Sequence, residues 1–159
     1  YTPEEWELAS QLKATFTDTG LPGKCTADYP EVKAAVMEKS DGGKKALNDF
    51  VIPYVHANSY ASGSTDVGDV SWLTPTAQFT AVTWASGSPG HSWQNVSLGR
   101  SSIGYKGVLL AAKVLAGSVA DLMEDASLLQ KARTEFNVSA AGGYDCPIEK
   151  GVIPGPQVL

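Results

Sequence analysis

The hydrophobic positions near the start of the chain are spaced as in a helix. Four apolar residues recur at intervals of three and four, which places them on one helical face: Trp6, Ala9, Leu12 and Phe16. Thr2 and Pro3 are typical of a helix start, and acidic residues follow in the first turn. The pattern predicts a helix over residues 3–16.

Three later segments also predict helices. Residues 30–39 form a short candidate that ends at the glycine-containing turn over residues 41–43. Residues 101–124 are apolar on most sides, which is typical of a helix in a core or against a sheet. Asp125 is a typical cap for a last helix, which the glycine pair at residues 142–143 ends.

Two segments predict strands. Residues 50–55 are short and apolar but include Pro53, which favours an edge strand. Residues 76–84 mix β-branched and aromatic side chains in partial alternation. The order of helices and strands predicts an α/β fold with a short mixed sheet flanked by helices, although two strands are too few to complete a sheet.

Composition limits the classes of function. The chain has 159 residues, 43% of them hydrophobic, and no shift in composition divides residues 1–159 into separate domains. A net charge of −5 without basic clusters disfavours nucleic-acid binding. We find no apolar run near the roughly 20 residues of a membrane span and no signal segment, so we expect no membrane association and a cytoplasmic location. Cys25 and Cys146 lie far apart, and reduced thiols fit that location.

The stretch SGSPGHSWQ, residues 86–94, carries His91, one of two histidines in the chain. A neutral imidazole can bind a metal, act as a general base, or serve a structural role through a backbone hydrogen bond. The loop between a predicted strand and a predicted helix favours a functional role, because open α/β folds bind ligands in such loops. Zinc needs about three or four protein ligands, so a metal site built on His91 requires others.

A second loop has both a functional and a structural interpretation. Residues 62–69, SGSTDVGD, can bind an anion through backbone N–H groups or can simply cap a helix. Asp66 and Asp69 suit a catalytic pair, but acidic residues at a helix start commonly stabilise the helix dipole. The spacing alone favours the structural interpretation.

The other histidine and three tryptophans favour structural roles. His56 has no carboxylate or cysteine at ligand spacing, so a structural or surface role is favoured. Trp72, Trp84 and Trp93 are predicted to pack in a core, with contact to a substrate as the alternative for Trp93.

Two stretches carry a resemblance to a known family: residues 63–94, which contain STDVGDVSW and PGHSWQ, and residues 104–122. They resemble the C-terminal part of dinuclear-metal aminoacylases and carboxypeptidases, within which the aminobenzoyl-glutamate hydrolase branch of amidohydrolases matches best. The resemblance extends in order from residue 3 to Cys146. It implies that residues 1–159 are one segment, the C-terminal portion of a zinc-peptidase-like catalytic domain.

The resemblance also implies roles for residues in the two loops. His91 matches the family's last metal ligand. Ser64, Thr65 and Asp66 match a loop that binds the substrate carboxylate or supports the site, and Ser92 is placed with them as a substrate-binding residue. In the complete enzymes two metal ions, zinc or manganese, activate a water for attack on the amide of an N-acyl amino acid or a p-aminobenzoyl-glutamate-like compound.

The resemblance implies that the family's other metal ligands and its general base belong to an N-terminal half outside this sequence, as does the lid or dimerisation domain. The resemblance therefore implies no catalytic residue on this segment, an incomplete metal site and no activity in isolation. It also implies an exposed face that the missing half, or a homodimer, would cover. Two alternatives stay open: a non-catalytic binding or interaction module with the same fold, and a separate subunit that completes its site with another polypeptide.

Overall fold

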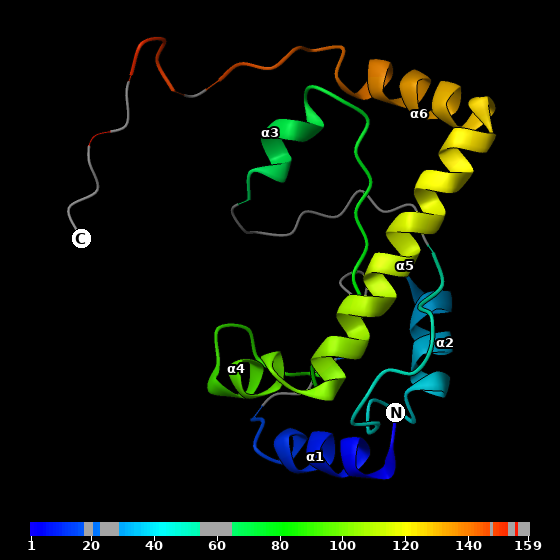
Figure 1. Ribbon diagram of the computed structural model, residues 1–159, viewed down its shortest axis with the longest axis vertical. Coiled ribbons are helices and arrows are strands. Elements are labelled where there is room, and N and C mark those ends of the chain that lie inside the picture. Colours follow the sequence, from blue (N-terminus) through cyan, green and yellow to red (C-terminus); the bar gives the residue numbers. More distant parts are fainter. Residues whose placement is uncertain (18–20, 23–28, 55–64, 147, 153–154, 156–159) are drawn as a thin grey trace. The chain divides into compact units, whose positions relative to one another are not determined.

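The computed structural model describes residues 1–17, 21–22, 29–54, 65–146, 148–152 and 155. These residues form six α-helices (Figure 1): α1 (Pro3–Lys13), α2 (Pro30–Lys39), α3 (Val67–Ser71), α4 (Trp93–Gly99), α5 (Ser102–Glu124) and α6 (Ala126–Ser139). No strand occurs in this described part of the chain. The predicted α/β fold with a short mixed sheet is therefore wrong, because the described residues are all-helical.

Both predicted strands are irregular segments. Residues 50–54, the described part of the first, and residues 76–84 belong to no helix or strand. The side chains of Phe79 and Trp84 are 43% and 44% exposed, so neither is packed as in the interior of a sheet. The strand preference of β-branched and aromatic residues depends on cross-strand neighbours, and no strand among the described residues provides them.

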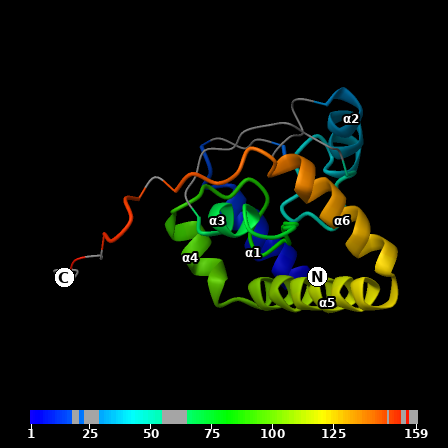
Figure 2. The same ribbon diagram turned by 90° about the horizontal axis from the view of Figure 1, so that it is seen from above.

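The chain divides into two compact units, which are described separately: Tyr1–Gly63 with Phe79–Val119, and Ser64–Gln78 with Ala120–Leu159. The first unit contains a hydrophobic core. Its buried members come from α1, from two irregular segments, and from the regions where α4 ends and α5 begins: Ala9, Leu12, Ala46, Leu47, Ala85, Leu98 and Ile103. In Figures 1 and 2, α1 and α4 accordingly lie beside the first turns of α5.

Helix α1 begins as the sequence predicts. Thr2 Oγ1 accepts a hydrogen bond from the backbone N–H of Glu5 (3.3 Å), and the Glu5 carboxylate accepts one from the N–H of Thr2 (2.7 Å). This reciprocal capping box satisfies two N–H groups that the helix itself cannot pair. The helix ends at Lys13, earlier than predicted, but Phe16 still packs against the core.

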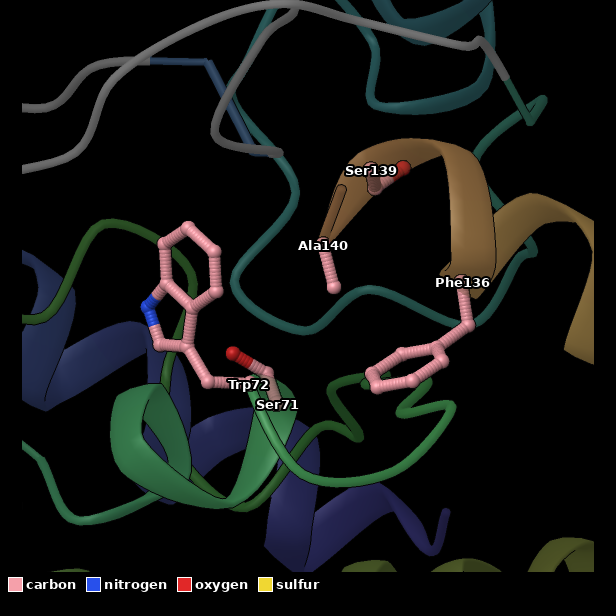
Figure 3. A pocket seen from close by; sticks show the side chains of 5 residues that line it. All are labelled: Ser71, Trp72, Phe136, Ser139 and Ala140. Carbon is pink, nitrogen blue, oxygen red and sulfur yellow. The ribbon is translucent and has the colours of Figure 1, made fainter. Parts of the chain in front are cut away.

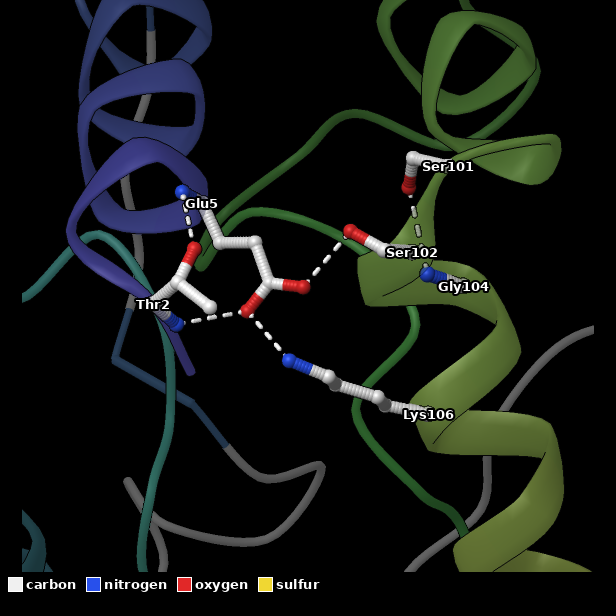
Figure 4. Close-up of polar contacts among 6 residues, drawn as sticks. All are labelled: Thr2, Glu5, Ser101, Ser102, Gly104 and Lys106. Carbon is white, nitrogen blue, oxygen red and sulfur yellow. Dashed lines mark hydrogen bonds and ion pairs between the residues drawn. The ribbon is translucent and has the colours of Figure 1, made fainter.

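The Glu5 side chain also joins α1 to the start of α5 (Figure 4). Ser102 Oγ donates a hydrogen bond to Glu5 Oε1 at 2.6 Å, and Lys106 Nζ lies 2.7 Å from Glu5 Oε2. The Lys106 ammonium, then the Ser102 hydroxyl and the Thr2 N–H, lower the pKa of the Glu5 carboxyl to about 2. Both carboxylate oxygens therefore have donors, which is what a buried acidic side chain requires.

Two glycines allow the first turns of α5 to approach neighbouring backbone closely. A methyl group added at Gly107 would overlap the carbonyl oxygen of Val82. A methyl group added at Gly104 would lie 2.7 Å from the carbonyl oxygen of Leu98. The absence of a side chain at these positions is thus what permits the packing of α5 in the first unit.

Beyond its first turns α5 is apolar and is not covered by the rest of the first unit, whereas the sequence predicts a helix packed in a core or against a sheet. Leu109 and Leu115 are 58% and 57% exposed. By length and composition alone this 23-residue helix is long and apolar enough to cross a membrane, since an 18-residue window within it has a mean hydropathy of 1.4. The expectation that no apolar run approaches that length is therefore wrong. One such helix is weak evidence for a span, because core helices can share these properties.

Candidate functional site

The loop that carries His91 is fixed at its base by two other segments of the first unit. Ala85 and Ser86 are buried, with 2% and 4% of their surface exposed. The N–H of Ser86 donates a hydrogen bond to the Ala46 carbonyl oxygen at 2.7 Å. Lys13 Nζ, at the end of α1, donates another to the Ser86 carbonyl oxygen at 2.9 Å. Burial lowers the pKa of the Lys13 ammonium, whose contact with a carbonyl dipole partly compensates for the water it has lost.

The other end of the loop is held by the start of α4. Ser92 caps this helix, since its Oγ accepts a hydrogen bond from the N–H of Asn95 (3.3 Å) and donates one to the Pro89 carbonyl oxygen (2.7 Å). Ser88 Oγ lies 2.6 Å from Asn95 Oδ1 and donates to it. The loop is thus closed on itself by short-range hydrogen bonds immediately around His91.

His91 is exposed at the end of this loop, directly before the Ser92 cap of α4, in a left-handed backbone conformation with φ of 53°. Among the described residues only His91 and Asp41 have positive φ without being glycine. Such a conformation is unfavourable for a side-chain-bearing residue and is enriched at functional sites. Nor does the imidazole have a hydrogen-bond partner within the described part of the chain, so the bond that a purely structural role requires is not formed there.

The described residues do not form a complete metal site. They contain no group of three or more histidine, cysteine, aspartate or glutamate side chains that could hold an ion. His91 offers one accessible nitrogen donor, whereas zinc takes about three or four protein ligands. The donor set therefore fits one ligand of a metal site and not the whole site, and metal binding by His91 stays a prediction.

The other predicted substrate-binding residues fall in different places. Ser64 and the second histidine, His56, lie outside the described residues. Thr65 and Asp66 are exposed ahead of α3 and belong to the second unit, so the structure does not place them relative to His91. The Asp66 side chain makes no capping hydrogen bond to α3, although it stands at the cap position. Ser92 uses its hydroxyl to cap α4.

The three tryptophans predicted for a core are not in one. Trp72, Trp84 and Trp93 are 40%, 44% and 62% exposed. Burial of a tryptophan needs a large apolar surface to cover both ring faces, and the described core consists mainly of alanine and leucine side chains around α1 and α4. Contact of Trp93 with a substrate stays a prediction.

The second unit contains a small aromatic cleft that the sequence did not indicate. Figure 3 shows the rings of Trp72 and Phe136 on two sides of this cleft, whose lining also includes Ser71, Ser139 and Ala140. The cleft has a volume of about 150 Å³. Tyr144 stacks on Trp72 with ring centroids 6.0 Å apart and donates a hydrogen bond to Asp69 Oδ1 at 2.6 Å. That bond raises the pKa of the Tyr144 phenol. Asp69 is thus engaged with Tyr144, a partner 75 residues away that no spacing rule could have identified.

Comparison with known proteins gives one informative similarity. A subunit of the p-aminobenzoyl-glutamate hydrolase of Escherichia coli (strain K12) is 47% identical to this chain over 161 residues. The match covers 98% of this chain and 33% of the relative, so the chain spans about one third of the length of the relative it matches. This similarity confirms the resemblance predicted from residues 63–94 and 104–122. No family model and no solved structure matches the chain.

Proposed function

We propose that this chain is part of a metal-dependent amidohydrolase that cleaves the amide bond of an N-acyl amino acid or a p-aminobenzoyl-glutamate-like compound. The observation that carries the proposal is the 47% identity to a p-aminobenzoyl-glutamate hydrolase subunit over 98% of the chain. An amide hydrolase for such a compound must hold a carboxylate-bearing substrate and polarise the bond to be cleaved. Only part of that machinery belongs to a chain one third as long as its relative.

We propose that His91 contributes a ligand to a metal ion in the complete enzyme, zinc or manganese. An exposed imidazole on a loop fixed by Lys13 and Ala46 supports this role, because a metal ligand must be accessible and held in one orientation. A metal ion of this kind would activate water for attack on the amide carbon. The remaining donors would come from residues outside the described chain, so this chain alone is expected to be inactive.

Ser64, Thr65, Asp66 and Ser92 are proposed to bind the substrate or to support the site. The exposed hydroxyl of Thr65 and the backbone ahead of α3 offer hydrogen-bonding groups for a carboxylate. The Ser92 hydroxyl already makes two hydrogen bonds, so its contribution would be to hold His91 next to it rather than to contact substrate.

The test uses a complete polypeptide in which this chain replaces the matching third of the E. coli relative. Hydrolysis of p-aminobenzoyl-glutamate is followed by release of p-aminobenzoate, and bound metal by elemental analysis. His91→Ala should lower metal content and reduce hydrolysis. Loss of a residue that only hydrogen-bonds to a metal ligand typically lowers activity about 10- to 100-fold, and loss of the ligand itself should lower it further. The matched control is His56→Ala, which removes the other histidine.

Unchanged metal content and hydrolysis in His91→Ala would refute the proposed ligand. A complete polypeptide that folds and shows no hydrolysis with the native His91 would instead favour the alternative of a non-catalytic binding module. Recovery of activity only when a second chain is added would identify a site completed between two polypeptides.

A further inference from the structure

The exposed portion of α5 is an apolar surface that continues around the helix. Between residues 108 and 120 the only charged residue is Lys113, which has no hydrogen bond or ion pair within the described part of the chain. Six large apolar side chains in this stretch are between 41% and 63% exposed: Val108, Leu109, Leu110, Val114, Leu115 and Val119. Successive helical residues point about 100° apart, so Val108, Leu109 and Leu110 alone face three directions.

The rest of the first unit covers only the first turns of this helix. The buried residues of α5 are Ile103, Gly104 and Gly107, and they pack on the end of α4 and on the segment that contains Val82. A helix that is apolar on all sides is normally buried, in the core of a larger protein or in a membrane. The surface over residues 108–119 therefore requires a partner other than the rest of the first unit.

Three kinds of partner from outside this chain can cover an apolar helix, and two fit poorly. A bilayer would surround Lys113, near the middle of the helix, with hydrocarbon, which costs about 2.5–3.5 kcal/mol on insertion scales. A second copy of this chain in a two-fold dimer would cover one side of α5 and leave the others in water. A larger body of protein covers several sides at once, and the E. coli relative continues through the two thirds of its length that this chain does not span.

We infer that the surface of α5 over residues 108–119 docks against the polypeptide that corresponds to those remaining two thirds, whether the same chain or another one supplies it. The inference rests on the proposed function, because that polypeptide would also supply the metal ligands that His91 lacks. The surface of that polypeptide that contacts α5 is apolar. It places a carboxylate or a carbonyl oxygen near the Lys113 ammonium, since a buried cation needs such a partner.

The experiment measures the accessibility of a cysteine placed on this surface. Leu115→Cys and the control Val96→Cys, on α4 and 78% exposed, are each made in the isolated chain and in the complete polypeptide built with the E. coli relative. Maleimide labelling is followed peptide by peptide in mass spectrometry, which separates these sites from Cys25 and Cys146. In the isolated chain both cysteines should react at similar rates. In the complete polypeptide Leu115→Cys should react at least about tenfold more slowly, while Val96→Cys should react as before.

Four outcomes would overturn the inference. Protection in the isolated chain that does not depend on protein concentration would identify this chain's own second unit as the cover of α5. Equal labelling of Leu115→Cys in both polypeptides would show that nothing docks there. Protection in the isolated chain that grows with protein concentration would identify a second copy, and protection only on phosphatidylcholine vesicles would identify a lipid surface. The same cysteine placed at the aligned position of the unaltered E. coli relative gives the readout even if the joined polypeptide does not fold.

Labelling requires neither metal nor turnover, so it separates the two proposals. A complete polypeptide that protects Leu115→Cys but has no hydrolase activity refutes the proposed function and supports the docking surface. Hydrolysis that depends on His91 while Leu115→Cys stays reactive supports the proposed function and refutes the docking surface.

Discussion

The carboxylate of Glu5 lies 2.7 Å from the ammonium of Lys106, a residue 101 positions further along the chain. Glu5 is buried, whereas the Lys106 side chain is 47% exposed. The pair is completed by Ser102 and by the capping interaction with Thr2, so one carboxylate both starts α1 and ties it to α5. Because the two residues are so far apart in sequence, this contact is a direct measure of the folded state of the first unit.

This pair predicts how stability depends on pH. The pKa of Glu5 falls from its ordinary value of 4.5 to about 2 on folding, because the folded state holds the charged form next to Lys106. Its contribution is therefore complete above pH 4.5 and is lost as the pH falls from about 4.5 to about 2. We expect the free energy of unfolding, measured by urea denaturation, to fall across this window.

Glu5→Gln should weaken that pH dependence, because the amide cannot change charge. The control is Glu38→Gln, an exposed position on α2 without an ion pair among the described residues, which should keep the slope of the native chain. If Glu5→Gln and the native chain have the same slope between pH 4.5 and pH 2, the ion pair with Lys106 is not formed in solution.

Close packing at Gly107 predicts that replacing glycine by alanine has opposite effects on the free energy of unfolding at two positions of α5. Gly107→Ala should lower the free energy of unfolding by about 1–3 kcal/mol, because its methyl group meets the Val82 backbone. Gly117→Ala should raise it by about 0.5–1 kcal/mol, because nothing lies near that position and alanine favours the helix. Urea denaturation of both variants checks the pair, and an equal gain at both positions would mean that α5 does not pack on the Val82 segment.

Much of the helical structure was predictable from local signals, and the tertiary contacts were not. The capping box at Thr2 and the cap at Asp125, which accepts a hydrogen bond from the N–H of Ser127 at 2.8 Å, depend on residues a few positions apart. The contacts of Glu5 with Lys106 and of Lys13 with Ser86 join residues 101 and 73 positions apart, which no spacing pattern encodes. The prediction of a strand at residues 76–84 is wrong because strand preference depends on packing against cross-strand neighbours, and the described residues contain no neighbouring strand.

The sequence predicted the loop that carries His91, but not the backbone conformation of His91 or the unit in which Thr65 and Asp66 lie. The Ser, Gly and Pro content of residues 86–90 indicated a turn beside His91, whereas the left-handed backbone of His91 itself had no sequence signal, because glycine is the residue that usually marks it. Thr65 and Asp66 were identified from the resemblance and stand in the other unit.

The hydrogen bond from Lys13 to the Ser86 carbonyl predicts that α1 supports the His91 loop. Lys13→Met keeps the apolar stem but removes the donor, so the free energy of unfolding should fall by about 1 kcal/mol. In the complete polypeptide the same change should weaken metal binding by up to about tenfold, because Lys13 positions the loop without touching the ion. Isothermal titration with zinc measures this, and Lys44→Met, which removes an exposed lysine, is the control. Unchanged zinc affinity in Lys13→Met, with reduced stability, would limit Lys13 to a structural role.

The left-handed backbone at His91 predicts an order of stability among its variants. Glycine adopts φ of 53° without steric cost, whereas for alanine the Cβ costs about 1 kcal/mol or more. His91→Gly should therefore be about 1 kcal/mol more stable than His91→Ala in urea denaturation of the isolated chain, even though both lack the imidazole. In the complete polypeptide both should lose metal and hydrolysis alike.

Asn95→Gly and Asn95→Ala provide the matched control for that comparison. Asn95 lies within α4, where glycine is less favourable than alanine, so the order of the two variants should reverse. If His91→Gly proves less stable than His91→Ala, the loop does not hold residue 91 in the left-handed conformation. If the order is as expected and metal is lost from both variants, the chain maintains an unfavourable backbone at His91 for the sake of the ligand it presents.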